Sequence, residues 1–483
     1  MSVNQEVLER TIDRFRERKV LLPTFAQMRN PHAVPQKIKD RLGQVGLWDV
    51  DPVNLFRITW KNEPVEQGGL FNQGNWIEFP SEFTGVDARI IGLVGKYFPT
   101  GAHKVGAAYG CLVPKLVSGQ FDPTTHKAVW PSTGNYCRGG AFDSALVGCT
   151  AVAILPEEMS RERFEWLKEI GAEIIATPGC ESNVKEIYDK CWEIRRTRPE
   201  CIIFNQFEEF GNPVWHYHVT GAMIEEIFDQ LPSGHRLAGY VSATGSAGTI
   251  AAGDRLRISH PGIRVVATEA LQCPTLYQLG FGGHRIEGIG DKHIPWVHNV
   301  RNTDMVAAID DEQCMALLRL FNEPIGQETL SHSLPDALIG QLSNLGISGI
   351  CNLVAATKAA RYYDMDGRDV LFICLTDSAD LYASRLEELA TERGTYTNEQ
   401  ALYDRARYLD GITTDALREL TYQDRKALHN FKYFTWVEQQ GRTAEELRQL
   451  WQPSFWEETF AQVEQWDQQI ESFNQQTGVL DLL

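Results

Sequence analysis

Short apolar runs alternate with helix-period segments through the middle of the chain. The predicted strands are KAVW near Val129, TAVAIL ending at Leu155, EIIA near Ile174, CIIF ending at Phe204, YVS ending at Ser242, RVVAT ending at Thr268 and VLFICL ending at Leu375. Several of these runs do not alternate with polar residues, which is typical of buried parallel strands. Between them, segments such as RERFEWLKEIG place Phe164, Leu167 and Ile170 on one helix face. This rhythm predicts an α/β protein with mostly parallel sheets, in which ligands bind at the carboxyl ends of strands.

The two ends of the chain have a different pattern. Residues 1 to about 60 hold a charged helix followed by loops with Pro and Trp, and from about residue 391 the strand signals vanish. The tail is predicted to be helical, and one helix begins with a capping box at Thr443 and Glu446. Its aromatic residues include Trp436, Trp451, Phe455, Trp456, Phe460 and Trp466. Such a tail must pack against the core or another subunit, and we expect a homo-oligomer formed through it.

Composition and charge exclude several classes of protein. The 483 residues are 43% hydrophobic, and their net charge of −18 argues against a nucleic-acid binder. No apolar run reaches the roughly 18 to 20 residues that cross a bilayer, and the N-terminus lacks the apolar region of a secretory signal. The ten cysteines include no C-x-x-C pair, which favours a reducing compartment. We therefore expect a cytoplasmic protein without a nucleic-acid or membrane partner. The His216 and His218 pair lacks a third ligand, so no metal site is predicted.

Lys104 lies in FPTGAHKVGAA, between Gly101 and Gly106. Small neighbours beside a tight turn let a lysine approach a flat ring without crowding. If the side chain is buried, its ammonium form is disfavoured, so the neutral amine can form an imine with an aldehyde. A surface lysine after a turn is the alternative interpretation.

Two further segments follow strands and suit anions. In WPSTGNYCRGGA, Ser132, Thr133 and Asn135 suit a carboxylate and a phenolic oxygen. VSATGSAGTIAAG opens a helix, so its backbone N–H groups can hold a phosphate, although it is neither a Walker loop nor G-x-G-x-x-G. Each segment alone is also compatible with a connecting turn.

ICLTDSADLY places Ser378 just past the last strong strand. Its hydroxyl is suited either to face a ring nitrogen or to cap a helix. Taken together, the four segments describe the site of one cofactor. They supply a lysine that can form an imine, a loop that can bind a carboxylate, a cradle for a phosphate and a partner for a ring nitrogen, each beside a strand end.

In order and spacing, these segments resemble the fold-type II pyridoxal-phosphate enzymes, in the cysteine synthase (O-acetylserine sulfhydrylase) and cystathionine β-synthase branch. The resemblance runs from about residue 80 to 390 and includes LPEEMSRERFEWLKEIGAEIIATPG, NQF with GNPVWHYHVTG, and EGIGDKHIP. It implies pyridoxal 5′-phosphate as the cofactor. It also implies two three-layer α/β domains with mostly parallel sheets, of the tryptophan synthase β-like type, plus helical N- and C-terminal extensions. The implied boundaries are an N-terminal extension at 1–60, a large cofactor-binding domain at 61–104 with 206–390, a smaller mobile domain at 105–205 and a C-terminal extension at 391–483.

The resemblance also implies roles for individual residues. Lys104 becomes the Schiff-base lysine, Asn135 contacts the cofactor's 3′-oxygen, and Ser378 faces its ring nitrogen. The phosphate loop comprises Thr244, Gly245, Ser246, Gly248 and Thr249. The residues assigned to the substrate or the site entrance are Ser132, Thr133, Gln206, Gly288 and Gly290.

The sequence departs from this pattern in places. Val-Gly-Ala follows Lys104 where the branch usually has an acidic–basic pair, and TGAHKV is closer there to the tryptophan synthase β-subunit. Cys137 replaces a small residue, Ala243 and Ala247 replace phosphate-loop glycines, and the stretch from about residue 321 to 345 is longer than expected. These departures leave the substrate undetermined.

A neutral hydroxyl beside the ring nitrogen leaves that nitrogen largely unprotonated, so expulsion of a β-leaving group competes well. We therefore predict chemistry at the β-carbon of a small amino acid through an aminoacrylate intermediate, with Lys104 as imine former and general base. β-Replacement with a thiol or sulfide co-substrate is the first hypothesis. The alternatives are β-elimination that releases a keto acid and ammonia, and a non-catalytic partner-binding subunit.

Overall fold

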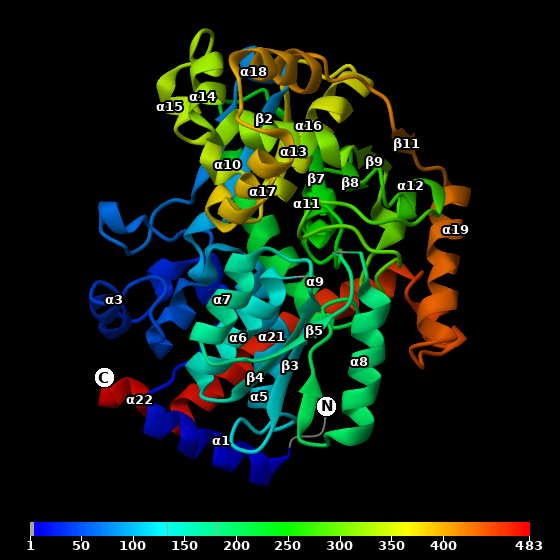
Figure 1. Ribbon diagram of the computed structural model, residues 1–483. Helices are drawn as coiled ribbons and strands as arrows, with labels where there is room; N and C mark the ends of the chain where they lie inside the picture. The colour runs from blue at the N-terminus through cyan, green and yellow to red at the C-terminus, as the bar shows by residue number, and fades with distance from the viewer. Residues whose placement is uncertain (1–3, 133, 181) are drawn as a thin grey trace.

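The computed structural model describes residues 4–132, 134–180 and 182–483, and these form two sheets (Figure 1). The larger sheet consists of β1 (Trp76–Phe79), β2 (Arg89–Val94), β7 (Arg236–Ala243), β8 (Arg264–Ala270), β9 (Met305–Ile309), β10 (Asp369–Leu375) and β11 (Leu417–Glu419). Its strand order is β1-β2-β10-β7-β8-β9-β11. Only the edge strands β1 and β11 are antiparallel to their neighbours among these described strands.

The smaller sheet is entirely parallel in the described residues. It consists of β3 (Lys127–Pro131), β4 (Thr150–Pro156), β5 (Glu173–Thr177) and β6 (Cys201–Ile203), in the order β5-β4-β3-β6. Along β4, Ala153 and Leu155 face the core that holds α5 (Lys104–Val117) and α6 (Asn135–Val147). Val152 faces the opposite core, which holds α8 (Val184–Thr197). Because both faces are covered, every second residue need not be polar, which explains the uninterrupted apolar run.

The larger sheet is covered on both faces in the same way. Leu371 and Ile373 of β10 pack in one core with α13 (Asp311–Asn322) and α16 (Ile347–Tyr362). Val370 and Phe372 belong to the other core, which extends to both ends of the chain. The predicted fold class, two three-layer α/β units with helical extensions, is confirmed. The domain boundaries stay a prediction.

The other helices surround these layers. They are α1 (Gln5–Arg18), α2 (Phe25–Arg29), α3 (Gln36–Leu42), α4 (Ser81–Thr84), α7 (Arg161–Glu169), α9 (Gly211–Trp215), α10 (Gly221–Asp229), α11 (Ala252–Ser259), α12 (Thr275–Gln278), α14 (Pro324–Ser331), α15 (Asp336–Ile339), α17 (Ala383–Arg393), α18 (Asn398–Asp404), α19 (Tyr422–Lys432), α20 (Ala444–Gln449), α21 (Pro453–Thr477) and α22 (Val479–Leu482). Within the described residues no single helix has the length and apolar character to cross a bilayer, and one sharply bent pair, 336–344 with 347–362, meets these criteria only jointly.

The C-terminal extension packs on the chain's own core. Phe15 lies edge-on to Phe473 at 5.1 Å between ring centroids, and Phe25 lies 5.7 Å from Trp466. Trp436 is fully buried. These aromatic residues therefore do not need a second subunit to cover them, so the reason for expecting an oligomer is lost, and the oligomer itself stays a prediction. The predicted helical character of the tail is confirmed, and the tail also contains the short strand β11, which pairs with β9.

Candidate active site

Lys104 is the first residue of α5 and follows a tight turn. Gly101 before it has a left-handed backbone (φ 68°), which glycine adopts without strain. Gly106 lets α5 pack closely against α9, since a Cβ there would lie 2.2 Å from ring atoms of Trp215. The Lys104 side chain is buried, and its Nζ donates to Ser246 Oγ at 3.2 Å. The small residues around Lys104 thus permit a buried position, which excludes the alternative of a surface lysine.

A small cavity beside Lys104 gathers residues from both sheets. Its lining consists of Lys104, Ser132, Asn135, Tyr136, Gln206, Phe207, Gly245, Ser246, Gly288 and Gly290. Ser132 and Asn135 follow β3, whereas Gly245 and Ser246 follow β7, so strand ends of the two sheets meet here. The structure therefore brings together most of the residues predicted for the cofactor and the substrate.

The loop after β7 forms a cradle of backbone N–H groups. A Cβ on Gly248 would lie 1.9 Å from Asn212 Oδ1, and one on Gly245 would lie 2.9 Å from the Gly288 carbonyl oxygen. Both positions therefore exclude a side chain unless their neighbours move. In the described part of the chain, the N–H groups of residues 245–248 donate to no protein acceptor. Adjacent unpaired N–H groups form an anion site, which suits the predicted phosphate loop.

The two threonines predicted for this loop are not among the residues that line the cavity. Thr244 Oγ1 donates to the carbonyl oxygen of Thr268 at 3.0 Å, and Thr249 Oγ1 lies 3.4 Å from His216 Nε2. Both side chains thus hold the ends of the loop in place. Their contact with a cofactor stays a prediction.

The loop after β3 presents polar groups to the cavity. Ser132 Oγ accepts hydrogen bonds from the Gly134 N–H at 3.1 Å and from Gln206 Nε2 at 3.3 Å. Gln206 Oε1 and Asn135 Oδ1 are buried and have no hydrogen-bond partner in the described part of the chain. Buried polar atoms rarely lack partners, so these two indicate a missing ligand. Thr133, also predicted for the substrate, lies outside the described residues.

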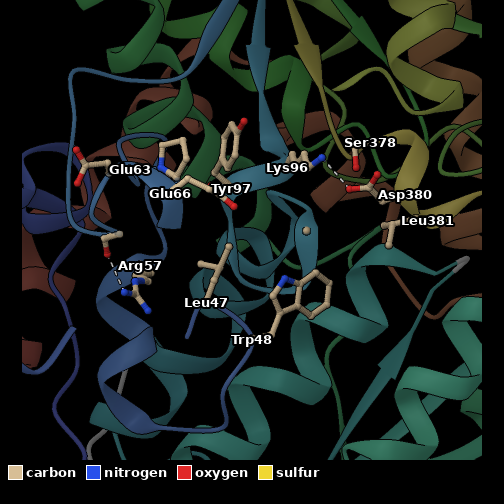
Figure 2. A pocket seen from close by; sticks show the side chains of 13 residues that line it. Leu47, Trp48, Arg57, Glu63, Glu66, Lys96, Tyr97, Ser378, Asp380 and Leu381 are labelled. Carbon is tan, nitrogen blue, oxygen red and sulfur yellow. Dashed lines mark hydrogen bonds and ion pairs between the residues drawn. The ribbon is translucent and has the colours of Figure 1, made fainter. Parts of the chain in front are cut away.

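Ser378 lines a different pocket. It shares that pocket with Trp48 of the N-terminal extension and with Lys96, which pairs with Asp380 at 2.8 Å (Figure 2). The Ser378 side chain is buried, but Ser378 is not among the residues that line the cavity beside Lys104. Its predicted contact with a ring nitrogen stays a prediction.

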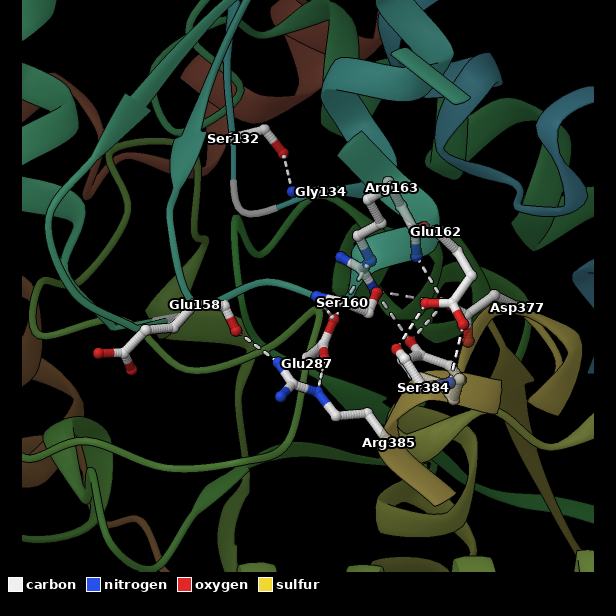
Figure 3. A network of polar contacts seen from close by, with 12 residues as sticks. Ser132, Gly134, Glu158, Ser160, Glu162, Arg163, Glu287, Asp377, Ser384 and Arg385 are labelled. Atoms are coloured by element: carbon white, nitrogen blue, oxygen red, sulfur yellow. Dashed lines mark hydrogen bonds and ion pairs between the residues drawn. The ribbon is translucent and has the colours of Figure 1, made fainter. Parts of the chain in front are cut away.

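Three buried charged residues next to the cavity were not predicted from the sequence. Arg163 Nε lies 3.2 Å from Glu287 Oε2, and Arg163 Nη2 lies 4.0 Å from Asp377 Oδ2. Figure 3 shows these side chains converging from three separate segments. Glu287 and Asp377 are adjacent in sequence to the predicted site residues Gly288 and Ser378, and this adjacency could have identified them. Nothing in the spacing indicates that Arg163 joins them.

Comparison with known proteins decides the family. Residues 96–331 match the family model described as pyridoxal-phosphate dependent enzyme. A probable cysteine synthase of Bacillus subtilis is 30% identical over 222 residues, which cover 46% of this chain and 70% of that protein. The chain belongs to the pyridoxal-phosphate dependent enzymes.

Other relatives agree with this assignment. A cysteine synthase of Staphylococcus aureus is 32% identical over 196 residues, which cover 40% of this pyridoxal-phosphate dependent enzyme and only 60% of that protein. The crystal structure of an O-acetylserine dependent cystathionine beta-synthase from Helicobacter pylori shares the fold, with a TM-score of 0.53 and 24% identity over 64% of this chain and 94% of that one. The predicted branch, cysteine synthase and cystathionine β-synthase, is confirmed.

The residues of this pyridoxal-phosphate dependent enzyme fit its cofactor. A buried lysine, a cradle of unpaired N–H groups and the buried Asn135 amide line one cavity. Lys104 would hold the aldehyde carbon, residues 245–248 the phosphate, and Asn135 the phenolic oxygen. The predicted cofactor, pyridoxal 5′-phosphate, is confirmed by the family.

Proposed function

We propose that this enzyme catalyses β-replacement on a small amino acid, with a thiol or sulfide as the second substrate. When bound, pyridoxal phosphate supplies an electron sink for negative charge at the α-carbon of the substrate. The observation that carries the proposal is the position of Lys104 Nζ in the same cavity as Ser132 and Gln206. An amine beside a carboxylate-binding loop can act on the α-proton of a bound amino acid. O-Acetylserine is the first substrate to test, because the matched Helicobacter pylori protein depends on it.

Each polar group in the cavity has a proposed role. Lys104 binds the cofactor and then moves the α-proton, while Ser132, Thr133 and Gln206 bind the substrate carboxylate. Asn135 donates to the cofactor's 3′-oxygen, and Gly288 leaves room for the substrate at the entrance. Thr244, Gly245, Ser246, Gly248 and Thr249 bind the phosphate, and Ser378 approaches the ring nitrogen.

Residues 105–205 are proposed to form a smaller domain that closes over the substrate. Contacts between its α7 and α17 of the larger part support this, since Glu162 Oε1 accepts from the Ser384 N–H at 2.8 Å. Closure excludes water and so protects the reactive substrate from hydrolysis. A cytoplasmic location and a homo-oligomer complete the proposal.

The decisive experiment compares the wild-type enzyme with Lys104→Ala. With O-acetylserine and sulfide, the wild type should form cysteine and should show the visible absorption of bound cofactor. Lys104→Ala should lose that absorption and at least about 10³-fold in turnover, because the variant lacks both the imine-forming amine and the general base. Absorption spectra and product analysis by chromatography measure both effects.

Product identity separates the alternatives. Steady release of pyruvate and ammonia in the absence of sulfide would show that the enzyme catalyses β-elimination, not β-replacement. A wild-type protein that takes up no cofactor would instead support a partner-binding subunit. An unchanged cofactor spectrum in Lys104→Ala would remove Lys104 from the site.

A further inference from the structure

The Asp377 carboxylate lies in the interior, directly after β10. Its Oδ2 accepts hydrogen bonds from Asn135 Nδ2 at 2.6 Å and from the Tyr382 hydroxyl at 2.7 Å. Arg163 Nη2 lies 4.0 Å from the same oxygen and donates to the Tyr382 hydroxyl at 3.0 Å. Asp377, Arg163 and Tyr382 are completely buried. One carboxylate oxygen thus gathers groups from three segments that are distant in sequence.

Such a group is expensive to bury, so its presence requires a reason. Burial raises the pKa of Asp377 above its ordinary value, although Arg163, Asn135 and Tyr382 oppose this shift. An apolar residue would fill the same space without desolvating a charge. Since Asn135 lines the cavity and Asp377 does not, the carboxylate acts on the cavity through Asn135.

A carboxylate can only accept, so it determines which end of the Asn135 amide faces it. The amide nitrogen must point to Asp377, and its second hydrogen is left for an acceptor in the cavity. Without Asp377, the two ends of the amide would be interchangeable. We propose that Asp377 is a positioning residue, held by Tyr382 and Arg163, that orients the Asn135 amide so that it donates to the phenolic oxygen of the cofactor. The inference rests on the proposed role of Asn135.

The same contact joins the two parts of the molecule. Asn135 and Arg163 belong to the segment 105–205, whereas Asp377 and Tyr382 follow β10 of the larger sheet. Arg163 also packs on the loop that leads to Asn135, since a Cβ on Gly134 would lie 1.7 Å from Arg163 Nη1. Asn135 is therefore oriented only when the two parts are together, so closure and cofactor contact depend on one another.

Three variants of the full-length enzyme test the proposal. Asp377→Leu removes the acceptor and keeps the same branched arrangement of side-chain heavy atoms, whereas Asp377→Asn keeps an acceptor oxygen without the charge. Tyr382→Phe removes one support of the carboxylate and is the variant least disruptive to the fold. Asp380→Asn is the matched control, because Asp380 lies on the same segment with a largely exposed side chain that pairs with Lys96.

The readouts are the dissociation constant of pyridoxal phosphate for the apoenzyme and the visible absorption spectrum of the bound cofactor. This spectrum responds to hydrogen bonding at the phenolic oxygen. Asp377→Leu should weaken cofactor binding by about tenfold and shift the spectrum, because the acceptor that orients the Asn135 amide is lost. Asp377→Asn should recover most of the affinity, Tyr382→Phe should show a smaller shift in the same direction, and Asp380→Asn should match the wild type.

A wild-type spectrum and affinity in Asp377→Leu would overturn the inference. If Asp377→Leu does not fold, the Tyr382→Phe variant tests the inference in its place. A wild-type spectrum in Tyr382→Phe would then overturn the inference. Equal losses in Asp377→Leu and Asp377→Asn would mean that the charge, not the acceptor, matters, which also contradicts the proposal. Failure of the wild type to bind cofactor would instead remove the proposed function.

Discussion

At the scale of single residues, close packing around Gly248 shapes the cradle. Asn212 lies against Gly248, and its Nδ2 donates to Ser246 Oγ at 3.0 Å and to the Gln206 carbonyl oxygen at 2.9 Å. Asn212 therefore links the loop after β7 to the residue that follows β6. Any side chain at position 248 must displace this link.

We predict that Gly248→Ala weakens cofactor binding and lowers the free energy of unfolding by about 1–3 kcal/mol, because overpacking moves Asn212 away from the cradle. Cofactor titration and urea denaturation measure the two effects. Gly262→Ala is the matched control, since no atom lies within 4 Å of a Cβ there. Equal behaviour of the two variants would show that the cradle tolerates a side chain.

The site could be predicted from the sequence where short motifs carry the groups. Lys104, Ser132, Asn135 and Gln206 come from such motifs and meet in one cavity. The Asp377 contact with Asn135 joins residues 242 positions apart, and no local pattern encodes it. Cys137, which replaces a small residue of the family pattern, is completely buried, and burial raises the pKa of its thiol to about 12.

At the scale of elements, polar contacts join α7 to α17 and form a clamp between these two helices. Glu162 Oε2 accepts from Ser384 Oγ at 2.6 Å, and Arg385 Nε donates to Glu287 Oε1 at 2.5 Å (Figure 3). Arg385 also donates to the Glu158 carbonyl oxygen. The contacts that join α7 to α17 are polar, so the two helices can separate without exposing a large apolar surface.

We predict that Glu162→Ala speeds hydrogen exchange of the α7 amides by about tenfold, because both hydrogen bonds to Ser384 are lost. Mass spectrometry of peptides from this helix measures the exchange. Glu165→Ala on the same helix is the control, because Glu165 is largely exposed and pairs only at the surface with Arg161. Equal hydrogen-exchange rates in the wild type and Glu162→Ala would show that the contacts of Glu162 with Ser384 do not stabilise α7.

Helix α19 buries a lysine. Lys432 Nζ donates to the carbonyl oxygens of Trp296 at 2.9 Å and His298 at 2.7 Å, and burial lowers the pKa of Lys432 to about 7. The unfolded chain, with an ordinary lysine pKa of about 10.4, binds more protons between these two values. Stability should therefore rise with pH through this window.

We predict that, between pH 7 and 9, the wild type gains up to about 2 kcal/mol of unfolding free energy relative to Lys432→Met, which lacks the titrating group. Urea denaturation at both pH values measures the difference. Lys168→Met, at an exposed position of α7, should follow the wild type at both. A constant gap between wild type and Lys432→Met would contradict the predicted pKa shift.

Most strands of the two sheets were predicted because their apolar runs are long and lack polar residues. The structure adds β1, β2, β9 and β11. The three residues of β11 are held to β9 by backbone hydrogen bonds. Such pairing requires no particular side chains, so the sequence carries no pattern from which β11 could be predicted. Gly92 lies in the middle of β2, because a Cβ there would lie only 3.1 Å from side-chain atoms of Phe79 and Leu375. This glycine breaks the apolar run, so the sequence pattern did not predict the strand.

At the scale of the whole molecule, the tail is part of the main core. Helix α21 (red in Figure 1) passes behind the smaller sheet in this view and packs against α1, α2 and α5. Trp466 and Ile470 of this helix belong to the same core as Phe25. Truncation near residue 395 would therefore expose that core.

We predict that Trp466→Ala lowers the free energy of unfolding by about 3–5 kcal/mol, because a buried aromatic side chain leaves a cavity. Urea denaturation measures this loss, and light scattering should show the same mass as the wild type. Leu482→Ala is the control in the same tail, since Leu482 is largely exposed. A change in mass with little loss of stability would place Trp466 at a subunit interface instead.

The contact between α1 and α21 has a consequence for synthesis in the cell. Arg16 Nε donates to the carbonyl oxygen of Thr477, 461 residues later, and Phe15 rests on Phe473. On the ribosome, the apolar side of α1 must wait until residues 453–477 have emerged before its partner α21 exists. Nascent chains that stall early would keep this side exposed, and chaperones and proteases recognise such surfaces. The pairing of α1 with α21 thus forms only after translation has reached the end of α21.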